Sequence, residues 1–322
     1  MKCADLFCGC GGLSSGFSNA GFDVVLGIDK WEKALNIYKK NFSHDVFEED
    51  INDEKRIESL LKEYNPDIVI GGPPCQDFSS AGKRDVTLGR ADLTYHYANI
   101  ICSYKPQFFV MENVDRIISS HILADVIEQF SSNGYGLTAV ILNAAYCGVP
   151  QSRLRFFLIG GQGIENNFLL PNLRNHLSSK EMTVRDYLGD SLGTEYYYRH
   201  PRNYNRRAVF SIDEPSPTIR GVNRPIPPGY KLNKCDPQNV SLEEVRPLTT
   251  IERSYIQTFS KDYIFEGSKT DLEQIIGNAV PVNLGKFVAS SLREFIENPI
   301  FQSDSLFNDL ILPTRFLKKT VA

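Results

Sequence analysis

Cys75 is the residue of this sequence best placed to do chemistry. It follows a short apolar run, Ile68 to Ile70, in the order Gly71-Gly72-Pro73-Pro74-Cys75-Gln76. The two prolines fix φ and remove backbone donors, so the thiol is held rigidly where a strand is expected to end. Open α/β sheets bind their ligands at the carboxyl ends of the strands. A cysteine with only a packing role would not need so rigid a support, and we interpret Cys75 as a functional thiol.

Three charged residues follow later apolar runs and complete a candidate catalytic group. Glu112 ends the run that begins at Phe108, which places a carboxyl group at the same edge of the expected sheet. Arg153 and Arg155 belong to the segment QSRLR, and the alternation of an extended chain puts both guanidinium groups on one side. A thiol, a carboxyl group and two cations are therefore expected to meet at one edge.

A glycine loop and two acids have the pattern of a nucleoside site. The first apolar run leads into Phe7-Cys8-Gly9-Cys10-Gly11-Gly12, where glycines let the backbone approach a ligand at the start of a helix. Asp29 closes the second run, where it can accept from both ribose hydroxyls, and Asp50 comes later, where it could meet an adenine amino group. Each feature alone also fits a tight turn or a helix cap. Together, at three consecutive strand ends, they favour a nucleoside site.

The elements that must position these residues alternate between strand and helix as far as about Gly161. Apolar runs of strand length occur at six places, namely Cys3 to Phe7, Val24 to Ile28, Ile68 to Ile70, Phe108 to Met111, Ala139 to Leu142 and Phe156 to Ile159. Helical spacing lies between them, as in Leu13 with Phe17. This pattern predicts an α/β fold with a doubly wound, mostly parallel sheet. From about Gln162 to Glu244, Pro, Asn, Arg and Tyr predict a second, smaller and irregular domain.

Charge is distributed unevenly along the chain. The net charge is −4, yet residues 199–235 hold eight Arg and Lys against two acids, a net of +6, so the rest of the chain carries −10. The arginines there are interleaved with Tyr196, Tyr197, Tyr198, Tyr204 and Tyr230. A basic segment can be an ordinary solvated face, but groups that pair with phosphates and stack on bases together favour nucleic acid.

Composition limits the other classes of function. The seven cysteines are odd in number and never spaced as CxxC, which indicates reduced thiols. No cluster of His or Cys accompanies Cys8 and Cys10, so we expect no metal site. The sequence has no apolar run long enough for a membrane span and opens with no signal or transit segment, so we expect a soluble, intracellular protein.

Six segments resemble the ordered motifs of the DNA (cytosine-5)-methyltransferases. They are DLFCGCGG, GPPCQ, ENV, QSRLR, RPLTTIE and GNAVPVN, and they extend from about Lys2 to Asn283. PPC alone could occur by chance, whereas chance does not readily give the whole series. The resemblance implies a bacterial restriction-modification enzyme of the cytosol that methylates double-stranded DNA with S-adenosyl-L-methionine, releasing S-adenosyl-L-homocysteine. It leaves open a cognate restriction endonuclease that acts separately, and we expect a monomer.

The resemblance also implies the catalytic roles. Cytosine C5 is a poor nucleophile, so a thiolate, that of Cys75, must first add to C6. Glu112, protonated or hydrogen-bonded at N3, and Arg153 and Arg155 near O2 would stabilise the charge that develops. A carboxyl group that donates at neutral pH needs a raised pKa, which a water-poor pocket supplies. The target base must leave the duplex, and Asp77 to Thr94 is interpreted as a mobile loop that closes over it.

Binding residues and domains follow from the same resemblance. It places ten residues in the cofactor pocket, namely Phe7, Gly9, Gly11, Gly12, Asp29, Asp50, Ile51, Pro74, Leu93 and Asn278. Five are expected against DNA, namely Gln76, Ser79, Thr218, Arg220 and Arg224. Because Asn278 is far along the chain, we predict a discontinuous catalytic domain of residues 1–162 and 268–322 around a target-recognition domain of residues 163–267. The adenine-stacking residue stays open, since Lys30 follows Asp29 and Trp31 could stack or belong to the core.

Three other functions remain as alternatives. A branch of the same family methylates cytosine in transfer RNA, but its Cys-Phe-Thr segment is absent from this sequence. A non-catalytic DNA-binding relative would usually lack the cysteine or the glutamate, and both are present here. A nicotinamide oxidoreductase fits poorly, because Ser14 occupies the third glycine position of the GxGxxG fingerprint.

Overall fold

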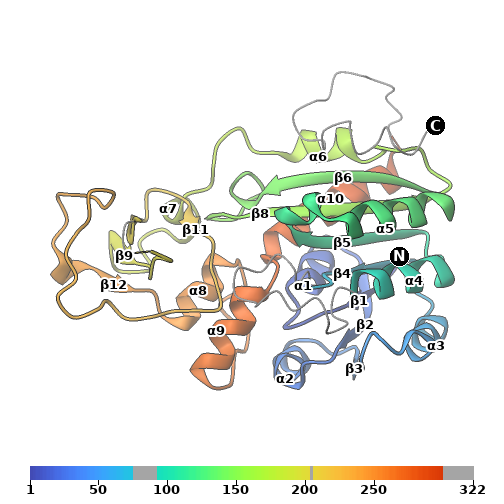
Figure 1. The fold of residues 1–322 in the computed structure, drawn as a ribbon, viewed down its shortest axis with the longest axis horizontal. Coiled ribbons are helices and arrows are strands. Elements are labelled where there is room, and N and C mark those ends of the chain that lie inside the picture. The colour runs from blue at the N-terminus through green and yellow to red at the C-terminus, as the bar shows by residue number, and fades with distance from the viewer. Residues whose placement is uncertain (75–92, 204–205, 300–322) are drawn as a thin grey trace.

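A seven-stranded sheet with helices on both faces forms the main part of the molecule (Figure 1). The structure is a computed structural model and describes residues 1–74, 93–203 and 206–299. The strand order is β3-β2-β1-β4-β5-β8-β6. In chain order the strands are β1 (Lys2–Leu6), β2 (Asp23–Asp29), β3 (Asp45–Glu48), β4 (Ile68–Gly71), β5 (Phe108–Val114), β6 (Tyr135–Asn143) and β8 (Leu154–Gln162).

The predicted doubly wound, mostly parallel sheet is confirmed. All pairs from β3 across to β5 are parallel, while β8 runs antiparallel to both β5 and β6. The chain returns from β6 to β8 through a connection too short for a parallel crossover, which forces this reversal. Strand β3 was not predicted, because its four residues lie at the sheet edge and are only half-buried or exposed.

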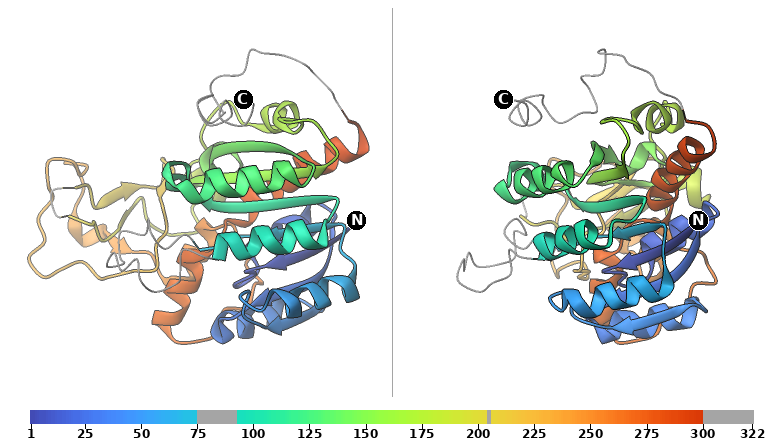
Figure 2. Two further views of the ribbon diagram at one scale, coloured as in Figure 1. Left: turned by 45° about the vertical axis from the view of Figure 1, so that its right-hand side comes forward. Right: turned by 90° about the vertical axis from the view of Figure 1, so that its right-hand side faces the viewer.

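Two layers of helices cover the sheet. Helices α3, α4 and α5 pack on one face, and α1, α6 and α10 pack on the other (Figures 1 and 2). The helices are α1 (Gly12–Asn19), α2 (Glu32–Asn41), α3 (Glu54–Tyr64), α4 (Leu93–Tyr104), α5 (His121–Ser132), α6 (Leu170–His176), α7 (Val184–Leu188), α8 (Thr250–Ile256), α9 (Lys269–Asn278) and α10 (Val282–Glu297). Short 3-10 turns lie at η1 (Asp115–Ser119), η2 (Ala144–Tyr146) and η3 (Leu242–Glu244).

The second lobe is built from short strands and loops, on the left in Figure 1. One small sheet has the order β10-β9-β12, from β9 (Tyr196–Tyr198), β10 (Val209–Ser211) and β12 (Arg246–Pro247). Another joins β11 (Ser216–Pro217) to β7 (Gln151–Ser152), directly before the arginine pair. Tyr197 and Tyr198 are 2% and 1% exposed in this core. Our interpretation of these two tyrosines as base-stacking groups was therefore wrong, because both faces of β9 are covered: Tyr197 packs in the cluster with Ile256, and Tyr198 in the cluster with Val245.

Helices α1 and α10 pack closely because α1 has glycine at the points of contact. A Cβ on Gly16 would lie 2.6 Å from the backbone nitrogen of Lys286 and 2.7 Å from the carbonyl carbon of Gly285. A Cβ on Gly12 would overlap the carbonyl oxygen of Val280. Backbone thus meets backbone, and the segment that begins α10 is held against the start of α1.

We predict that Gly16→Ala destabilises the protein by about 1 to 3 kcal/mol, because the added methyl group meets backbone that cannot rotate away. Gly285→Ala is the matched control in the facing helix. A Cβ there has its nearest neighbours at 3.5 Å, which is ordinary contact. The control should be neutral or stabilising by up to about 1 kcal/mol through helix propensity. Denaturant unfolding measures both, and equal effects would contradict this account of the contact.

Candidate active site

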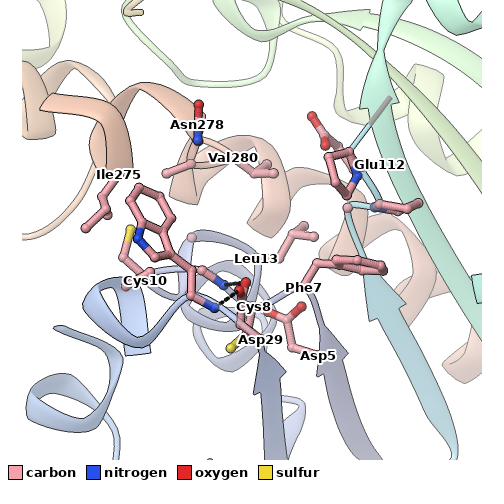
Figure 3. Close-up of a pocket in the computed structure, with 18 of the residues that line it drawn as sticks. Asp5, Phe7, Cys8, Cys10, Leu13, Asp29, Glu112, Ile275, Asn278 and Val280 are labelled. Atoms are coloured by element: carbon pink, nitrogen blue, oxygen red, sulfur yellow. Dashed lines mark hydrogen bonds between the residues drawn. The ribbon is translucent and has the colours of Figure 1, made fainter. Parts of the chain in front are cut away.

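A cavity of about 420 Å³ opens at the carboxyl edge of the sheet. Its walls come from the ends of β1, β2, β4 and β5, from the β7–β8 turn and from the end of α9 (Figure 3). The size is that of a pocket for a small organic ligand. Residues distant in sequence, such as Phe7, Glu112 and Asn278, therefore face one space.

Most predicted catalytic and cofactor residues line this cavity. They are Phe7, Gly9, Gly12, Asp29, Pro74, Leu93, Glu112, Arg153, Arg155 and Asn278. Three others do not line it. Gly11 caps α1 and packs toward Phe42, Ile51 is buried in the core, and Asp50 is exposed beside Lys30. Cys75, Gln76, Ser79 and almost all of the predicted mobile loop lie outside the described residues, but Pro74, which precedes Cys75, is in the cavity wall.

Asp29 joins the glycine loop to the end of β2. Its Oδ2 accepts from the Gly9 amide at 2.8 Å and its Oδ1 accepts from the Trp31 amide at 2.8 Å (Figure 3). Each carboxylate oxygen keeps a further lone pair for a ligand hydroxyl. Burial raises the pKa of Asp29, although the backbone donors offset part of this effect. The carboxylate is thus oriented before any ligand binds.

Glu112 and Arg155 form the other functional pair of the cavity. The Nε of Arg155 lies 2.8 Å from Oε1 of Glu112, which is 9% exposed. Gly72 leaves room for this side chain, since a Cβ there would lie 3.1 Å from Glu112 Oε2. Burial raises the pKa of Glu112, and the charges of Arg155 and Arg153 offset only part of that rise. Glu112 therefore keeps its proton to a higher pH than an ordinary glutamate, as a proton donor requires.

Arg153 uses its guanidinium group to hold backbone. It is 1% exposed and donates to the carbonyl oxygens of Ile219 (3.0 Å), Gly277 (3.2 Å) and Ala279 (3.1 Å). Its Nε is buried and has no hydrogen-bond partner among the described residues. The predicted pair of arginines is thus divided, because Arg155 meets Glu112 while Arg153 ties the cavity wall to the second lobe.

Asp5 is a cavity residue that sequence analysis missed. Its side chain is fully buried, and Ser14 Oγ donates to Oδ2 at 2.6 Å. Oδ1 has no hydrogen-bond partner among the described residues. Burial raises the pKa of Asp5 from its ordinary 3.8 to about 7. The signal in the sequence was an acid inside the first apolar run, directly before the glycine loop.

Trp31 belongs to the cavity wall, which sequence analysis had left open. The ring is half-buried and packs with the cluster that includes Ala34 and Ile275. Cys10 and Ile275 lie on the side of the cavity away from Glu112 (Figure 3). The cavity therefore has one end with an acid and an aromatic ring and another with the Glu112–Arg155 pair.

Three of the five predicted DNA contacts, Thr218, Arg220 and Arg224, lie in the second lobe. Thr218 Oγ1 donates to the Ser152 carbonyl oxygen at 2.9 Å, and Arg220 Nη2 donates to the His200 carbonyl oxygen at 2.5 Å. Arg224 is exposed. Of the basic residues in 199–235, five are exposed, namely Arg202, Arg206, Arg224, Lys231 and Lys234. Arg207 instead pairs with Glu214.

The described residues also bear on metal-dependent and membrane-spanning classes of protein. Within residues 1–74, 93–203 and 206–299, no group of three His, Cys, Asp or Glu side chains could hold a metal ion. In the same ranges, every helix is too short or too polar to cross a bilayer.

Known proteins show the same combination of sequence and fold. The chain is 66% identical over 300 residues to the type II methyltransferase M.HindV of Haemophilus influenzae, covering 93% of this chain and 99% of that protein. It is 51% identical over 306 residues to the type II methyltransferase M.HgiDI of Herpetosiphon aurantiacus (95% and 98%). The crystal structure of S. pombe Dnmt2 methyltransferase has the same fold, with a TM-score of 0.67 at 16% identity (92% and 99%). Residues 1–294 match the C-5 cytosine-specific DNA methylase model, and the chain belongs to that family.

Proposed function

We propose that this chain is the modification enzyme of a type II restriction-modification system. It transfers a methyl group to C5 of a cytosine in duplex DNA, with Cys75 as the covalent nucleophile. The observation that carries the proposal is one cavity whose two ends differ, with Asp29 and Trp31 at one end and Glu112 with Arg155 at the other. Pro74 lies in the wall, and Cys75 is the residue that follows it in the sequence.

Chemically, the cavity suits S-adenosylmethionine, which members of the family use. That molecule carries a sulfonium and an ammonium charge, and the free Oδ1 of Asp5 is a buried acceptor for a cation. The two oriented oxygens of Asp29 fit the ribose hydroxyls, and the Trp31 ring fits the adenine. When bound, the cofactor supplies an electrophilic methyl group.

The residues of the chain then perform the steps on the base. The thiolate of Cys75 adds to C6, and the electron pair of the C5–C6 bond moves toward N3 and O2. Protonated Glu112 donates to N3 while Arg155 holds the carboxyl group in place. C5 would take the methyl group as the bond from that group to the donor sulfur breaks. A base would then accept the C5 proton while Cys75 leaves as a thiolate, which restores the aromatic ring. Arg153 contributes by fixing backbone rather than by touching O2.

The predicted division into domains is also a proposal, with one adjustment. Leu169 and Leu173 pack in the core that contains α10, so residues up to about 177 go with the catalytic domain. The exposed basic residues of the second lobe would then contact DNA phosphates, and Arg220 would read a base. Gln76, Ser79, Thr218 and Arg224 remain proposed DNA contacts.

The direct test of the function is bisulfite sequencing of DNA from a host that expresses this chain. We expect 5-methylcytosine at one short recurring site, and Cys75→Ser should abolish it because a hydroxyl group is a far weaker nucleophile at C6. Duplex DNA with 5-fluorocytosine at the target should form a stable adduct with the parent and none with Cys75→Ser. A methylation rate within about tenfold of the parent would exclude Cys75 as the nucleophile.

Asp29→Asn should weaken S-adenosylmethionine binding by about 1 to 3 kcal/mol, because one charged acceptor for the ribose hydroxyls is lost. Asp23→Asn, at the other end of the same strand, is the matched control and should bind normally. Calorimetry measures both affinities, and the unfolding midpoint without cofactor shows whether the glycine loop is intact. Unchanged affinity in Asp29→Asn would leave Asp29 with only its contacts to the loop.

Asp5 should make stability depend on pH. Its folded-state pKa of about 7 exceeds 3.8, so between these values the folded protein holds a proton that the unfolded chain has lost. Stability should therefore fall as pH rises from about 4 to above 7, by roughly 2 to 4 kcal/mol for this group. Asp5→Asn should lose less stability than the parent between pH 5 and pH 8 in urea unfolding, and should bind cofactor more weakly at pH 8. Parallel stability profiles would show that Asp5 does not titrate in this range.

A further inference from the structure

The loop 218–223 is fixed at its first two residues by contacts to backbone and buried polar groups. The Thr218 carbonyl oxygen accepts from Arg199 Nη2 at 2.8 Å. The Ile219 amide donates to Gln151 Oε1 at 2.9 Å, and its carbonyl accepts from Arg153. One end of the loop is thus anchored beside the cavity.

The rest of the loop is held by a buried ion pair that no step of catalysis uses. Arg253 on α8 pairs with Glu273 on α9, and each is 4% exposed. Arg253 Nη2 also donates to the carbonyl oxygen of Arg220. Glu273 Oε1 accepts from Asn223 Nδ2 at 3.0 Å and from Thr250 Oγ1 at 2.7 Å. The pair therefore makes hydrogen bonds to the loop on both sides of Gly221.

Between these two points, at Gly221, the loop lies directly on helix α9. A Cβ on Gly277 would overlap the Gly221 nitrogen and the Arg220 carbonyl carbon, so only glycine allows this approach. On the outer side, Gly221 is exposed and Val222 is 50% exposed. The loop has a rigid inner face and an open outer face.

A buried ion pair is a weak explanation for stability, because desolvation of two charges offsets most of their attraction. What such a pair provides is one fixed geometry with several directed hydrogen bonds. Here those bonds end on the loop and on the start of α8. The fixed geometry of the ion pair therefore sets the position of the loop 218–223 and of the groups on its outer face.

We propose that Arg253 and Glu273 are positioning residues that set the sequence discrimination of the enzyme. They hold the 218–223 backbone so that Arg220 and its neighbours meet the base edges in register. This inference rests on the proposed function, in which the loop reads DNA. Neither residue lines the cavity, so the chemistry and the cofactor site should not depend on them.

The test compares two duplexes, one with the site found by methylation mapping and one with a single base pair of that site changed outside the target cytosine. In Arg253→Met/Glu273→Leu both charges are replaced by apolar groups, which preserves stability in comparable buried pairs. We expect kcat/KM on the cognate duplex to fall by about 10- to 100-fold, through KM for DNA. The altered duplex should change by less than about threefold, and KM for S-adenosylmethionine should be unchanged.

Arg253→Lys provides a second variant should the double variant unfold. It keeps the charge opposite Glu273 but lacks the forked N–H that reaches Arg220, so it should show the same loss of discrimination at near-normal stability. Arg185→Met is the matched control, because Arg185 pairs with Asp190, Glu195 and Asp213 in the same lobe and, among the described residues, makes no hydrogen bond or ion pair with the loop. It should discriminate like the parent.

The outcomes separate this inference from the proposed function. Equal losses on both duplexes, normal discrimination in a folded variant, or the same loss in Arg185→Met would each overturn the positioning role. Absence of any methylated site with the parent chain would instead contradict the proposed function itself, and this inference with it. A selective loss on the cognate duplex supports both.

Discussion

The close contact between the start of α1 and the segment 277–288 is the constraint on which the rest of the structure depends. Gly12 and Gly16 let backbone lie on backbone there, so a segment from late in the chain closes a cavity that begins in the first strand. Asn278 enters the wall by this route, and the carbonyl groups of Gly277 and Ala279 come within reach of Arg153. A side chain at either glycine would move α10 outward, and the cavity would lose one wall. These glycines matter because they lack a side chain and so allow two backbone segments to pack closely, and not because they make the chain flexible.

Three acids line the cavity, and their burial costs folding free energy. Asp5, Asp29 and Glu112 all have raised pKa values because burial disfavours their charged forms. Asp5 Oδ1 has no hydrogen-bond partner among the described residues to offset the free-energy cost of its burial, whereas Arg155 offsets part of that cost for Glu112. A cationic ligand beside Asp5 would give this oxygen a partner. Because folding has already removed water from Asp5, the ligand would not have to meet that desolvation cost when it binds. In the proposed mechanism Glu112 differs, because its raised pKa keeps the proton with which it would donate to N3 of the base.

Residues that follow strand ends could be predicted from the sequence, because a parallel sheet brings all its carboxyl ends to one edge. Asp29, Glu112 and Pro74 meet in one cavity for that reason. The partners of Arg153 could not be predicted, since they lie 66 to 126 residues away and are backbone carbonyls, which leave no mark on residue type. Tyr197 and Tyr198 looked like base-stacking groups because short strands in an irregular lobe have too few residues to show alternation. Asp50 lies just after β3, yet its side chain pairs with Lys30 at the surface instead of lining the cavity.

The residues that hold the loop 218–223 bind mainly its backbone atoms. The position of the loop therefore does not depend on the side chains that it exposes. Gln151 and Arg153 hold the peptide groups of Ile219, and Arg253 holds the carbonyl of Arg220. None of these bonds involves the Val222 side chain, which is half exposed. Side chains on the outer face could therefore change without loss of the loop's position. Because Arg153 and Gly277 also belong to the cavity wall, the loop is held at a fixed distance from the cavity. Under the proposed function, its distance to the reacting base would then not depend on the sequence that it reads.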